Sequence, residues 1–600
     1  MKRSHSSTYR KTAQPLLPKH REPTARGEYD MYPAYPLVDG QIDHGFVELA
    51  SNLIGHSQIV IDGYVGVLWD QFRAHLDQAL QSRGTRAEWI SVAQALRPTE
   101  EIEALVEPFL GGDDPIFGKR FTGTLTDFFN IQSLPAKTDP REMTIYYGTG
   151  AALVTEDAYL VYVDVPKNEI QYRARAGSIH NLGATEAADP GRMYKRFYFV
   201  DWVVLNAHKA TLLPNVDLYV DEQDAEIPAM ITGAALRQAL NEMGHSYCRV
   251  RPWFEPGPWG GQWMKERILQ LAQDVPNYAW SFEMIAPEQG IVLESSGNLL
   301  EISFDLLMAQ DARAILGDHA ERFGQQFPIR FDFLDTVGGG NLSVQCHPRP
   351  SYIRHHFGED FTQDETYYIL DAHPGAKVYL GFQESIDPDE FRSALENSFQ
   401  HGTPVEIDRF VKALPSENHC LFLIPSGTIH CSGTDNLVLE ISATPYIFTF
   451  KMYDWLRLDL QGKPRPLNIQ RAFDNLYFER RGEMVERELM SQPTLLKTGE
   501  DWQIHHLPTH PSHFYDVHRM EFGTSIQVHT GGSPHLLMLV EGTSVRLETC
   551  NGKSQRFNYA ETFLIPAAAE CYRLINESTT PAKVVKAFLK PDWKEPGELV

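Results

Sequence analysis

Four side chains that can bind a metal ion occur in strand-like segments of one part of the chain: Gln345, His347, Glu365 and His430. Side chains alternate between the two faces of a strand, so Ser343, Gln345 and His347 share one face of the stretch 341–348, and apolar residues occupy the other. Buried polar groups need partners, and a metal ion is one way to supply them. Taken alone, the stretch is more often an ordinary half-exposed strand.

Two further residues favour a metal site over an ordinary half-exposed strand. Glu365 opens the strand-like run Thr366–Leu370, and His430 follows the turn Pro425-Ser-Gly of a later hairpin. One amide, two imidazoles and one carboxylate on adjacent strands of a barrel form a mixed nitrogen and oxygen site. Such a site suits zinc and leaves open positions for a substrate.

The elements that must position these side chains are short strands. After residue 290, alternating strands are separated by Gly, Pro, Asn and Asp, with helices such as Pro388–Ser398 between some of them, which predicts β-barrels or jelly rolls. The segment Phe422–His430 recurs as Phe563–Cys571, with strand, proline turn and strand preserved. This repeat predicts two barrels. Cys571 replaces His430 in the second copy, so only the first barrel is predicted to hold a metal.

The first third of the chain has a different pattern. Helical spacing over Asp70–Arg83 alternates with apolar, strand-like runs at Ser57–Gly63, Ala158–Val165, Phe197–Leu205 and Val216–Val220. Strands that alternate with helices predict a parallel α/β sheet from residue 46 to about residue 225.

The shape of this segment resembles a nucleoside-kinase domain of the P-loop class. Its loop Gly63–Asp70 follows a strand, but Leu68, Trp69 and Asp70 replace the second glycine, the lysine and the hydroxyl residue of that motif. An aspartate there repels phosphate, so we predict a kinase-like scaffold without kinase chemistry, a pseudokinase. The stretch Tyr172–Arg175 is similar to a kinase lid arginine pair, or it is a surface helix with two arginines.

Composition limits the class of protein. The 600 residues contain 54 Lys and Arg against 79 Asp and Glu, a net charge of −25. This charge disfavours a nucleic-acid or membrane partner, and apolar residues at 42% of the chain suffice for buried cores. The six cysteines form no CxxC pair, which predicts reduced thiols in a cytoplasmic protein. We expect an enzyme that acts on small molecules, and its oligomeric state stays open.

Four domains are predicted from these patterns. They are a basic, irregular arm at 1–45, the kinase-like α/β domain at 46–230, the metal-binding barrel domain at 231–480 and a metal-free barrel domain at 481–600.

The metal-binding segments resemble type I mannose-6-phosphate isomerases, a family with a cupin fold. Asn341–Pro348 is similar to the family's LSVQxHP segment, Glu365–Gly381 to its metal-ligand glutamate and the strands after it, and Ile424–His430 to its IPAGTxH. Trp259–Gly261 and Met452–Trp455 resemble flanking motifs, and the similarity extends over about 250–600. It implies cupin barrels and one zinc ion per chain, bound by Gln345, His347, Glu365 and His430.

The resemblance also implies chemistry, the aldose–ketose isomerisation of a sugar phosphate. The family has a glutamate in its pocket where Glu440 lies, and the alternation of Val438, Glu440 and Ser442 fits a position inside the barrel. A solvent-facing strand glutamate is the alternative. Glu283 is a weaker candidate for an acidic residue in the pocket.

Several positions depart from the family where it handles phosphate. Lys451 stands in place of an arginine, Gln363 in place of a lysine two residues before the ligand glutamate, and Asp332 in place of another lysine, with Arg330 nearby. Replacement cations follow the ligand strand at Arg349 and Arg354, which otherwise belong to a solvated loop. Arg457 either contributes its positive charge to the pocket or caps the segment that contains it.

Three hypotheses remain. The first is a zinc enzyme that interconverts mannose 6-phosphate and fructose 6-phosphate, with Glu440, Lys451 and Arg457 as catalytic residues and Ser343, Arg349 and Arg354 as substrate-binding residues. The second is an isomerase of an unphosphorylated or different sugar. The third is a non-catalytic sugar sensor built from a cupin and a pseudokinase.

Overall fold

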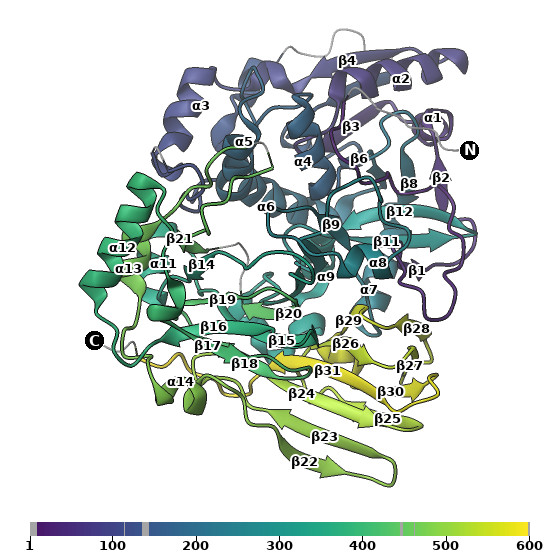
Figure 1. The fold of residues 1–600 in the computed structure, drawn as a ribbon. Helices are drawn as coiled ribbons and strands as arrows, with labels where there is room; N and C mark the ends of the chain where they lie inside the picture. The colour runs from purple at the N-terminus through teal and green to yellow at the C-terminus, as the bar shows by residue number, and fades with distance from the viewer. Residues whose placement is uncertain (1–8, 113, 135–142, 444–447, 461, 598–600) are drawn as a thin grey trace. The chain divides into compact units, whose positions relative to one another are not determined.

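The structure is a computed structural model that describes residues 9–112, 114–134, 143–443, 448–460 and 462–597 (Figure 1). The first eight residues of the predicted basic arm lie outside this description. Two compact units emerge from the contacts within the chain. Unit 1 comprises Met1–Pro23, Tyr32–Met243 and Glu288–Asp311, and unit 2 comprises Thr24–Met31, Gly244–Pro287 and Ala312–Val600.

Unit 1 is built on a sheet whose order is β2-β8-β7-β6-β3-β5-β4. The strands β4, β5, β3, β6 and β7 pair in parallel, while β8 and β2 run antiparallel at one edge. The parallel sheet predicted for this part of the chain is therefore present. Its strands are β2 (Ile42–His44), β3 (Gln58–Gly63), β4 (Ala87–Ser91), β5 (Met143–Tyr147), β6 (Tyr159–Asp164), β7 (Leu218–Asp221) and β8 (Ala229–Thr232).

Helices connect these strands. They are α1 (Phe46–Leu53), α2 (Trp69–Ser82), α3 (Thr99–Val106), α4 (Lys167–Ala176), α5 (Pro190–Arg196), α6 (Trp202–Leu212) and α7 (Gly233–Gly244). The predicted helix Asp70–Arg83 is confirmed by α2. The predicted strand at Phe197–Leu205 is wrong, because this run forms a π-helical turn, Phe197–Asp201, that continues into α6. A continuous apolar run fits a buried helix as well as a buried strand.

A smaller sheet in unit 1 joins distant parts of the chain. Its strands are β1 (Ala34–Pro36), β11 (Gly290–Ser295) and β12 (Asn298–Ser303), in the order β1-β11-β12. Ala34, Val292 and Leu299 form its buried apolar contact, so the segment near residue 34 is fixed by residues almost 260 positions later.

Unit 2 contains two pairs of antiparallel sheets. The first pair has the orders β18-β15-β20-β13-β10-β9 and β17-β16-β19-β14-β21. Its strands are β9 (Trp253–Glu255), β10 (Trp280–Met284), β13 (Ile329–Asp335), β14 (Val344–Cys346), β15 (Asp364–Ala372), β16 (Lys377–Phe382), β17 (Val411–Pro415), β18 (Leu421–Ile424), β19 (His430–Ser432), β20 (Asn436–Ala443) and β21 (Phe450–Tyr453). The accompanying helices are α8 (Trp263–Arg267), α9 (Phe304–Leu316), which begins in unit 1, α10 (Ala320–Phe323), α11 (Pro350–Phe357), α12 (Pro388–His401), α13 (Ile469–Asn475) and α14 (Glu483–Glu488).

The second pair of sheets has the orders β22-β23-β24-β31-β26-β29 and β25-β30-β27-β28. Its strands are β22 (Thr494–Thr498), β23 (Trp502–Leu507), β24 (Tyr515–Phe522), β25 (Ser525–His529), β26 (His535–Glu541), β27 (Ser544–Thr549), β28 (Ser554–Asn558), β29 (Thr562–Ile565), β30 (Cys571–Asn576) and β31 (Ala582–Leu589). The sequence repeat is also a structural one. The turn between β18 and β19 leads to His430, and the corresponding turn between β29 and β30 leads to Cys571.

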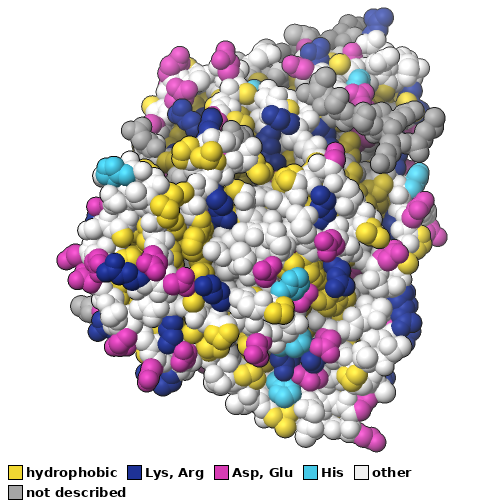
Figure 2. Space-filling model, in the orientation of Figure 1, with side chains coloured by type: hydrophobic (Ala, Val, Ile, Leu, Met, Phe, Trp, Pro, Cys, Tyr) yellow, Lys and Arg dark blue, Asp and Glu magenta, His cyan; other side chains and the backbone are white. Residues whose placement is uncertain are grey.

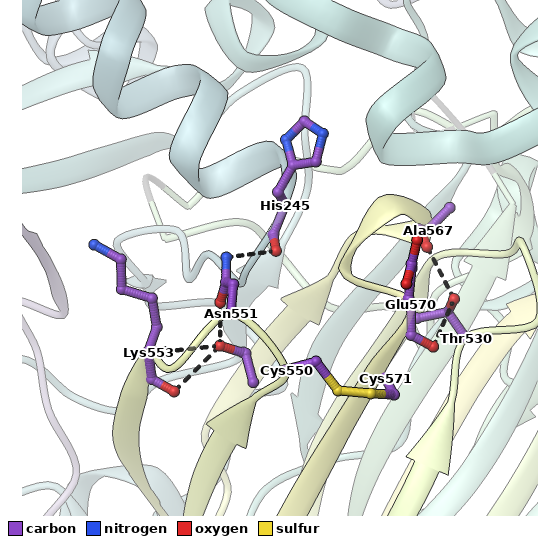
Figure 3. The surroundings of a disulfide bond; sticks show 9 residues. His245, Thr530, Cys550, Asn551, Lys553, Ala567, Glu570 and Cys571 are labelled. Atoms are coloured by element: carbon purple, nitrogen blue, oxygen red, sulfur yellow. Dashed lines mark hydrogen bonds between the residues drawn. A yellow bond between two sulfur atoms is a disulfide. The ribbon is translucent and has the colours of Figure 1, made fainter.

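The prediction that all cysteines are reduced thiols is wrong. Cys550 and Cys571 form a disulfide with a Cα–Cα distance of 5.7 Å (Figure 3). Cys571 begins β30, and Cys550 follows β27, which pairs with β30, so strand pairing brings the two together. The low number of cysteines carried no information about this proximity. The cytoplasmic expectation consequently loses its support from these two residues.

The surface mixes both signs of charge. In the face shown in Figure 2, acidic and basic side chains are interspersed with apolar ones. Among the described residues, every helix is too short or too polar to cross a membrane.

Candidate metal centre

The predicted ligands come together inside the first pair of sheets. Gln345 on β14 is the register partner of His430 on β19, so their side chains share one face of that sheet. Glu365 lies at the start of β15 in the facing sheet. His347, Glu365 and His430 are fully buried and offer ligand atoms within 4.8 Å of one another. The common face predicted for Gln345 and His347 is therefore confirmed.

Backbone carbonyls fix the orientation of both imidazoles. His347 Nδ1 lies 2.9 Å from the carbonyl oxygen of Phe448, and His430 Nδ1 lies 2.9 Å from that of Thr428. A carbonyl only accepts hydrogen bonds, so each Nδ1 carries a proton and donates it. In the neutral imidazoles, each Nε2 therefore presents a lone pair to the centre.

Those lone pairs face the two carboxylate oxygens. His347 Nε2 is 3.1 Å from Glu365 Oε2, and His430 Nε2 is 2.8 Å from Glu365 Oε1. The Gln345 amide lies 3.3 Å from His430 Nε2. His347 Nε2 and Glu365 Oε1 are buried, and neither makes a well-aligned hydrogen bond within the described part of the chain. Converging lone pairs of this kind need a cation between them, so the donor set fits a divalent metal ion such as zinc.

The electrostatics of Glu365 agree with this geometry. Burial alone would raise the pKa of this carboxyl group, but the positive charge that His347 and His430 carry when protonated outweighs burial and holds the pKa well below its usual range. A metal cation between neutral imidazoles and this carboxylate would act in the same sense. The Glu365 side chain is thus a carboxylate, the form that a metal site requires.

A second charged group lies on the same sheet. Glu440 on β20 is only 4% exposed, so it is not a solvent-facing strand residue. Arg330 Nη2 donates to Glu440 Oε1 at 2.5 Å, and Arg330 Nε lies 3.3 Å from Asp332 Oδ1. Gln363 Nε2 donates to Glu365 Oε2 at 3.0 Å and to Glu440 Oε1 at 3.5 Å, which links Glu440 to the ligand cluster. Burial and then the nearby Glu365 raise the pKa of Glu440, while Arg330 opposes the rise.

A cluster of cations gathers around Asp454. Arg457 Nη2 donates to Asp454 Oδ1 at 2.7 Å, Arg465 Nη1 donates to Asp454 Oδ2 at 2.8 Å, and Ser343 Oγ donates to Asp454 Oδ1 at 2.8 Å. Lys451 is the register partner of Gln345, which places it beside this cluster and the metal ligands. Burial, and then the charges of Arg465 and Arg457, lower the pKa of Lys451 to about 7.

The remaining predicted residues have other contacts. Arg349 donates to the backbone carbonyls of Asn475 and Leu476, and its guanidinium lies 3.9 Å from the centre of the Tyr477 ring. Arg354 on α11 forms an ion pair with Glu595. The structure does not bring these two arginines into contact with the described metal ligands, and their role in substrate binding stays a prediction.

Comparison with known proteins adds two kinds of relationship. A family model described as a domain of unknown function (DUF8485) matches residues 45–245. Curated relatives are the second kind of match. The probable mannose-6-phosphate isomerase GmuF of Bacillus subtilis is 35% identical over 163 residues, 26% of this chain and 48% of that protein. The mannose-6-phosphate isomerase of Streptococcus mutans is 27% identical over 224 residues, 36% of this chain and 64% of that protein.

The solved structures that resemble this chain also include a mannose 6-phosphate isomerase. The crystal structure of the mannose 6-phosphate isomerase from Bacillus subtilis is 18% identical, with a TM-score of 0.45, and covers 57% of this chain and 99% of that one. This chain spans about half to two thirds of the length of the curated relatives that it matches.

Sequence reasoning missed two contributions to the site. Arg465, between Pro464 and Pro466, carries no periodic pattern that points to Asp454, eleven positions away. Arg330 was noted only as a neighbour of Asp332. The alternation of Arg330 and Asp332 on one strand was the available signal, because it puts both side chains on the face that Glu440 shares.

Proposed function

We propose that this chain is a metal-dependent aldose–ketose isomerase that interconverts mannose 6-phosphate and fructose 6-phosphate. The observation that carries the proposal is the buried cluster of His347, Glu365 and His430, with both imidazoles oriented by backbone carbonyls. The names of the curated relatives support the reaction class.

The ligands in this proposal are Gln345, His347, Glu365 and His430, which would hold one zinc ion per chain. When bound, zinc supplies Lewis-acid polarisation of the oxygens on sugar carbons C1 and C2. The buried walls exclude water from the cluster, since all three charged or imidazole ligands are fully buried. The exclusion protects a reactive enediolate from side reactions.

Glu440 is the proposed base. A glutamate whose pKa is raised by burial is a better proton acceptor at neutral pH than an exposed one. Its carboxylate takes a proton from one of the two sugar carbons and returns it to the other. Arg330 holds Glu440 Oε1 by a hydrogen bond and thereby orients the carboxylate.

Lys451, Arg457 and Arg465 are the proposed phosphate-binding residues, and Ser343 holds Asp454 in place between them. A second candidate function is isomerisation of an unphosphorylated sugar. One observation favours it: Asp454 already accepts hydrogen bonds from Arg457 and Arg465, so part of the positive charge is compensated inside the protein. The ratio of kcat/KM for mannose 6-phosphate to that for mannose decides between the two.

The decisive test measures bound metal and isomerase turnover on the same preparations. The wild-type chain should contain one zinc ion and interconvert the two sugar phosphates, and His430→Ala should lose both properties. His529→Ala is the matched control, because His529 is an exposed histidine at the end of β25. Wild-type protein with stoichiometric zinc and no turnover on either sugar phosphate would contradict the proposal.

A further inference from the structure

Unit 1 contains a cavity at the edge of its parallel sheet. From β3 the chain proceeds to β4, returns to β5 between them, and then crosses to β6 on the other side of β3. The strand order therefore reverses at β3, and ligands of open α/β sheets bind outside the carboxyl ends of strands at such a point. The cavity, of about 530 Å³, is lined there by the segments that follow β3, β4 and β5. Small-molecule sites have volumes of about 300–1,000 Å³.

The loop after β3 lacks the means to bind phosphate. Trp69 occupies the position of the motif's lysine, and its ring covers Gly63 so closely that an added Cβ there would lie 2.9 Å away. The Gly66 carbonyl accepts a hydrogen bond from Arg173 Nη1 at 2.8 Å, so this part of the loop turns an oxygen, not an N–H group, toward the nearest buried cation. That cation is itself paired with Glu222 at 2.5 Å. The alternative of a surface helix with two arginines is therefore wrong for Arg173, which is fully buried.

The charge of the cavity also disfavours a phosphate group. Neither lysine nor arginine occurs among the described residues that line it, and Asp70 adds a negative charge in the first turn of α2. A phosphate group at this place would meet a carboxylate, and His180 is the only other titratable side chain besides the tyrosines among the described lining residues, so no permanent cation offsets the repulsion. The partial positive charge of a helix N-terminus is about half an elementary charge, which does not balance a full negative one.

The walls combine aromatic rings with hydrogen-bonding groups. Tyr9, Trp69 and Tyr147 supply ring faces and edges, and Ser91 and Thr149 supply hydroxyl groups. Trp69 Nε1 donates to Thr149 Oγ1 at 3.2 Å, which fixes the indole. Helix α2 begins at Trp69 without a side-chain cap, so its first backbone N–H groups are further donors. Aromatic faces stack on sugar and base rings, and hydroxyl and N–H groups bind their hydroxyl edges.

The wall formed by Tyr9 is held in place by polar contacts within unit 1. Ser178 Oγ donates to the carbonyl oxygen of Tyr9 at 2.6 Å. Arg10 forms a bidentate ion pair with Glu169, with Nε and Nη2 each 2.9 Å from a carboxylate oxygen. The beginning of the described chain is thus anchored as one side of the cavity.

We propose that this cavity binds an uncharged ring compound bearing several hydroxyl groups, a free sugar or a nucleoside, and does not bind nucleotides. The shared chemistry of the two sources is a ring with stackable faces, a hydroxylated edge and no phosphate. This site is independent of the isomerase proposed for unit 2.

The test titrates the full chain with D-mannose, adenosine and ATP by calorimetry and measures hydrogen–deuterium exchange in each complex. We expect D-mannose or adenosine to bind and to slow exchange in 64–71 and 147–149, which separates this site from the metal centre of unit 2. ATP should give no protection of these segments. The comparison of D-mannose with adenosine identifies which source of the ring is recognised.

Single substitutions test which residues of the cavity contact the ligand. Trp69→Ala and Ser91→Ala should each weaken the binding of the compound that slows exchange at least tenfold. Trp502→Ala on β23, in the other unit, should leave that affinity unchanged. Ser91→Ala removes one hydroxyl group from a half-buried position, so it reports on binding even if Trp69→Ala impairs folding. Protection of these segments by ATP, protection by neither neutral compound, or unchanged affinity in Ser91→Ala would overturn the proposal.

Discussion

Replacement of Arg330 by methionine should expose how much the candidate site depends on one buried cation. Arg330 is 4% exposed, and its guanidinium donates to Glu440 Oε1 at 2.5 Å and to Ser442 Oγ at 2.7 Å. Asp332 Oδ1 lies 3.3 Å from Arg330 Nε. Asp332 and Glu440 are register partners on adjacent strands, so their carboxyl groups share one face. Arg330→Met leaves both without their cation.

The size of the effect follows from this arrangement. Removal of one partner from a buried ion pair costs about 3–5 kcal/mol, because the remaining charge is uncompensated. We expect Arg330→Met to lower the free energy of unfolding of unit 2 by this amount. Arg330→Met combined with Glu440→Gln should recover at least about 2 kcal/mol of the loss, since one of the orphaned carboxylates is then gone. Arg330→Lys should cost less than Arg330→Met, because lysine keeps the positive charge, but it should not match wild type, because an ammonium group cannot bond Ser442 and Glu440 in Arg's fixed geometry.

Urea unfolding followed by tryptophan fluorescence at one pH supplies the four corners of the double-mutant cycle. Arg487→Met serves as the control, because the Arg487 side chain is 68% exposed and its ion pair among the described residues is with the exposed Glu488. Its cost should stay within about 0.5 kcal/mol. A loss below about 1 kcal/mol for Arg330→Met, or additive effects of Arg330→Met and Glu440→Gln, would refute the electrostatic account of this cluster.

Three further changes test other parts of the molecule. Treatment with EDTA should abolish isomerase turnover and lower the melting temperature, and zinc should restore both; an unchanged melting temperature in metal-free protein would contradict a metal that binds the folded state. Burial, opposed by Arg249, raises the pKa of Glu283 from 4.5 to about 7, so the contribution of Glu283 to wild-type stability should fall by about 3 kcal/mol as the pH rises from about 4.5 to about 7. Glu283→Gln should lack this fall in urea unfolding at pH 5 and pH 8, and an identical pH dependence in the variant would count against it. Cys550→Ser breaks a disulfide between residues 21 positions apart and should cost about 3 kcal/mol in thermal unfolding, whereas Cys420→Ser, a free thiol, should cost less than half as much.

The part of the site that sequence predicted rests on local periodicity. Alternation along 341–348 put Gln345 and His347 on one face, and the structure places both beside His430. The hairpin signals around Glu365 and His430 indicated the other two candidate ligands, which the structure places in the same buried cluster. A strand period of two is a property of neighbouring residues, so a single sequence is enough to read it.

The parts that sequence did not predict depend on contacts between distant residues. Arg330 and Glu440 are 110 positions apart, and Tyr29, which donates to Glu283 at 2.7 Å, is 254 positions from it. The pairing of Cys550 with Cys571 likewise follows from the register of β27 and β30, not from the number of cysteines. Neither composition nor spacing encodes such pairings, since they are set by how the sheets assemble.

The charges in direct contact at the candidate centre give a reason for a divalent ion in particular. Glu365, Glu440 and Asp332 contribute three carboxyl groups, and Arg330 is the cation that contacts two of them. If all three carboxyl groups are ionised, two negative charges remain, which equals the charge of one zinc ion. Without such an ion the balance must come from protons, and burial followed by the neighbouring Glu440 does raise the pKa of Asp332 well above its usual range. A monovalent cation would leave one buried charge unpaired, at a cost of several kcal/mol. A divalent ion bound at this centre would therefore supply the charge that Arg330 alone leaves uncompensated.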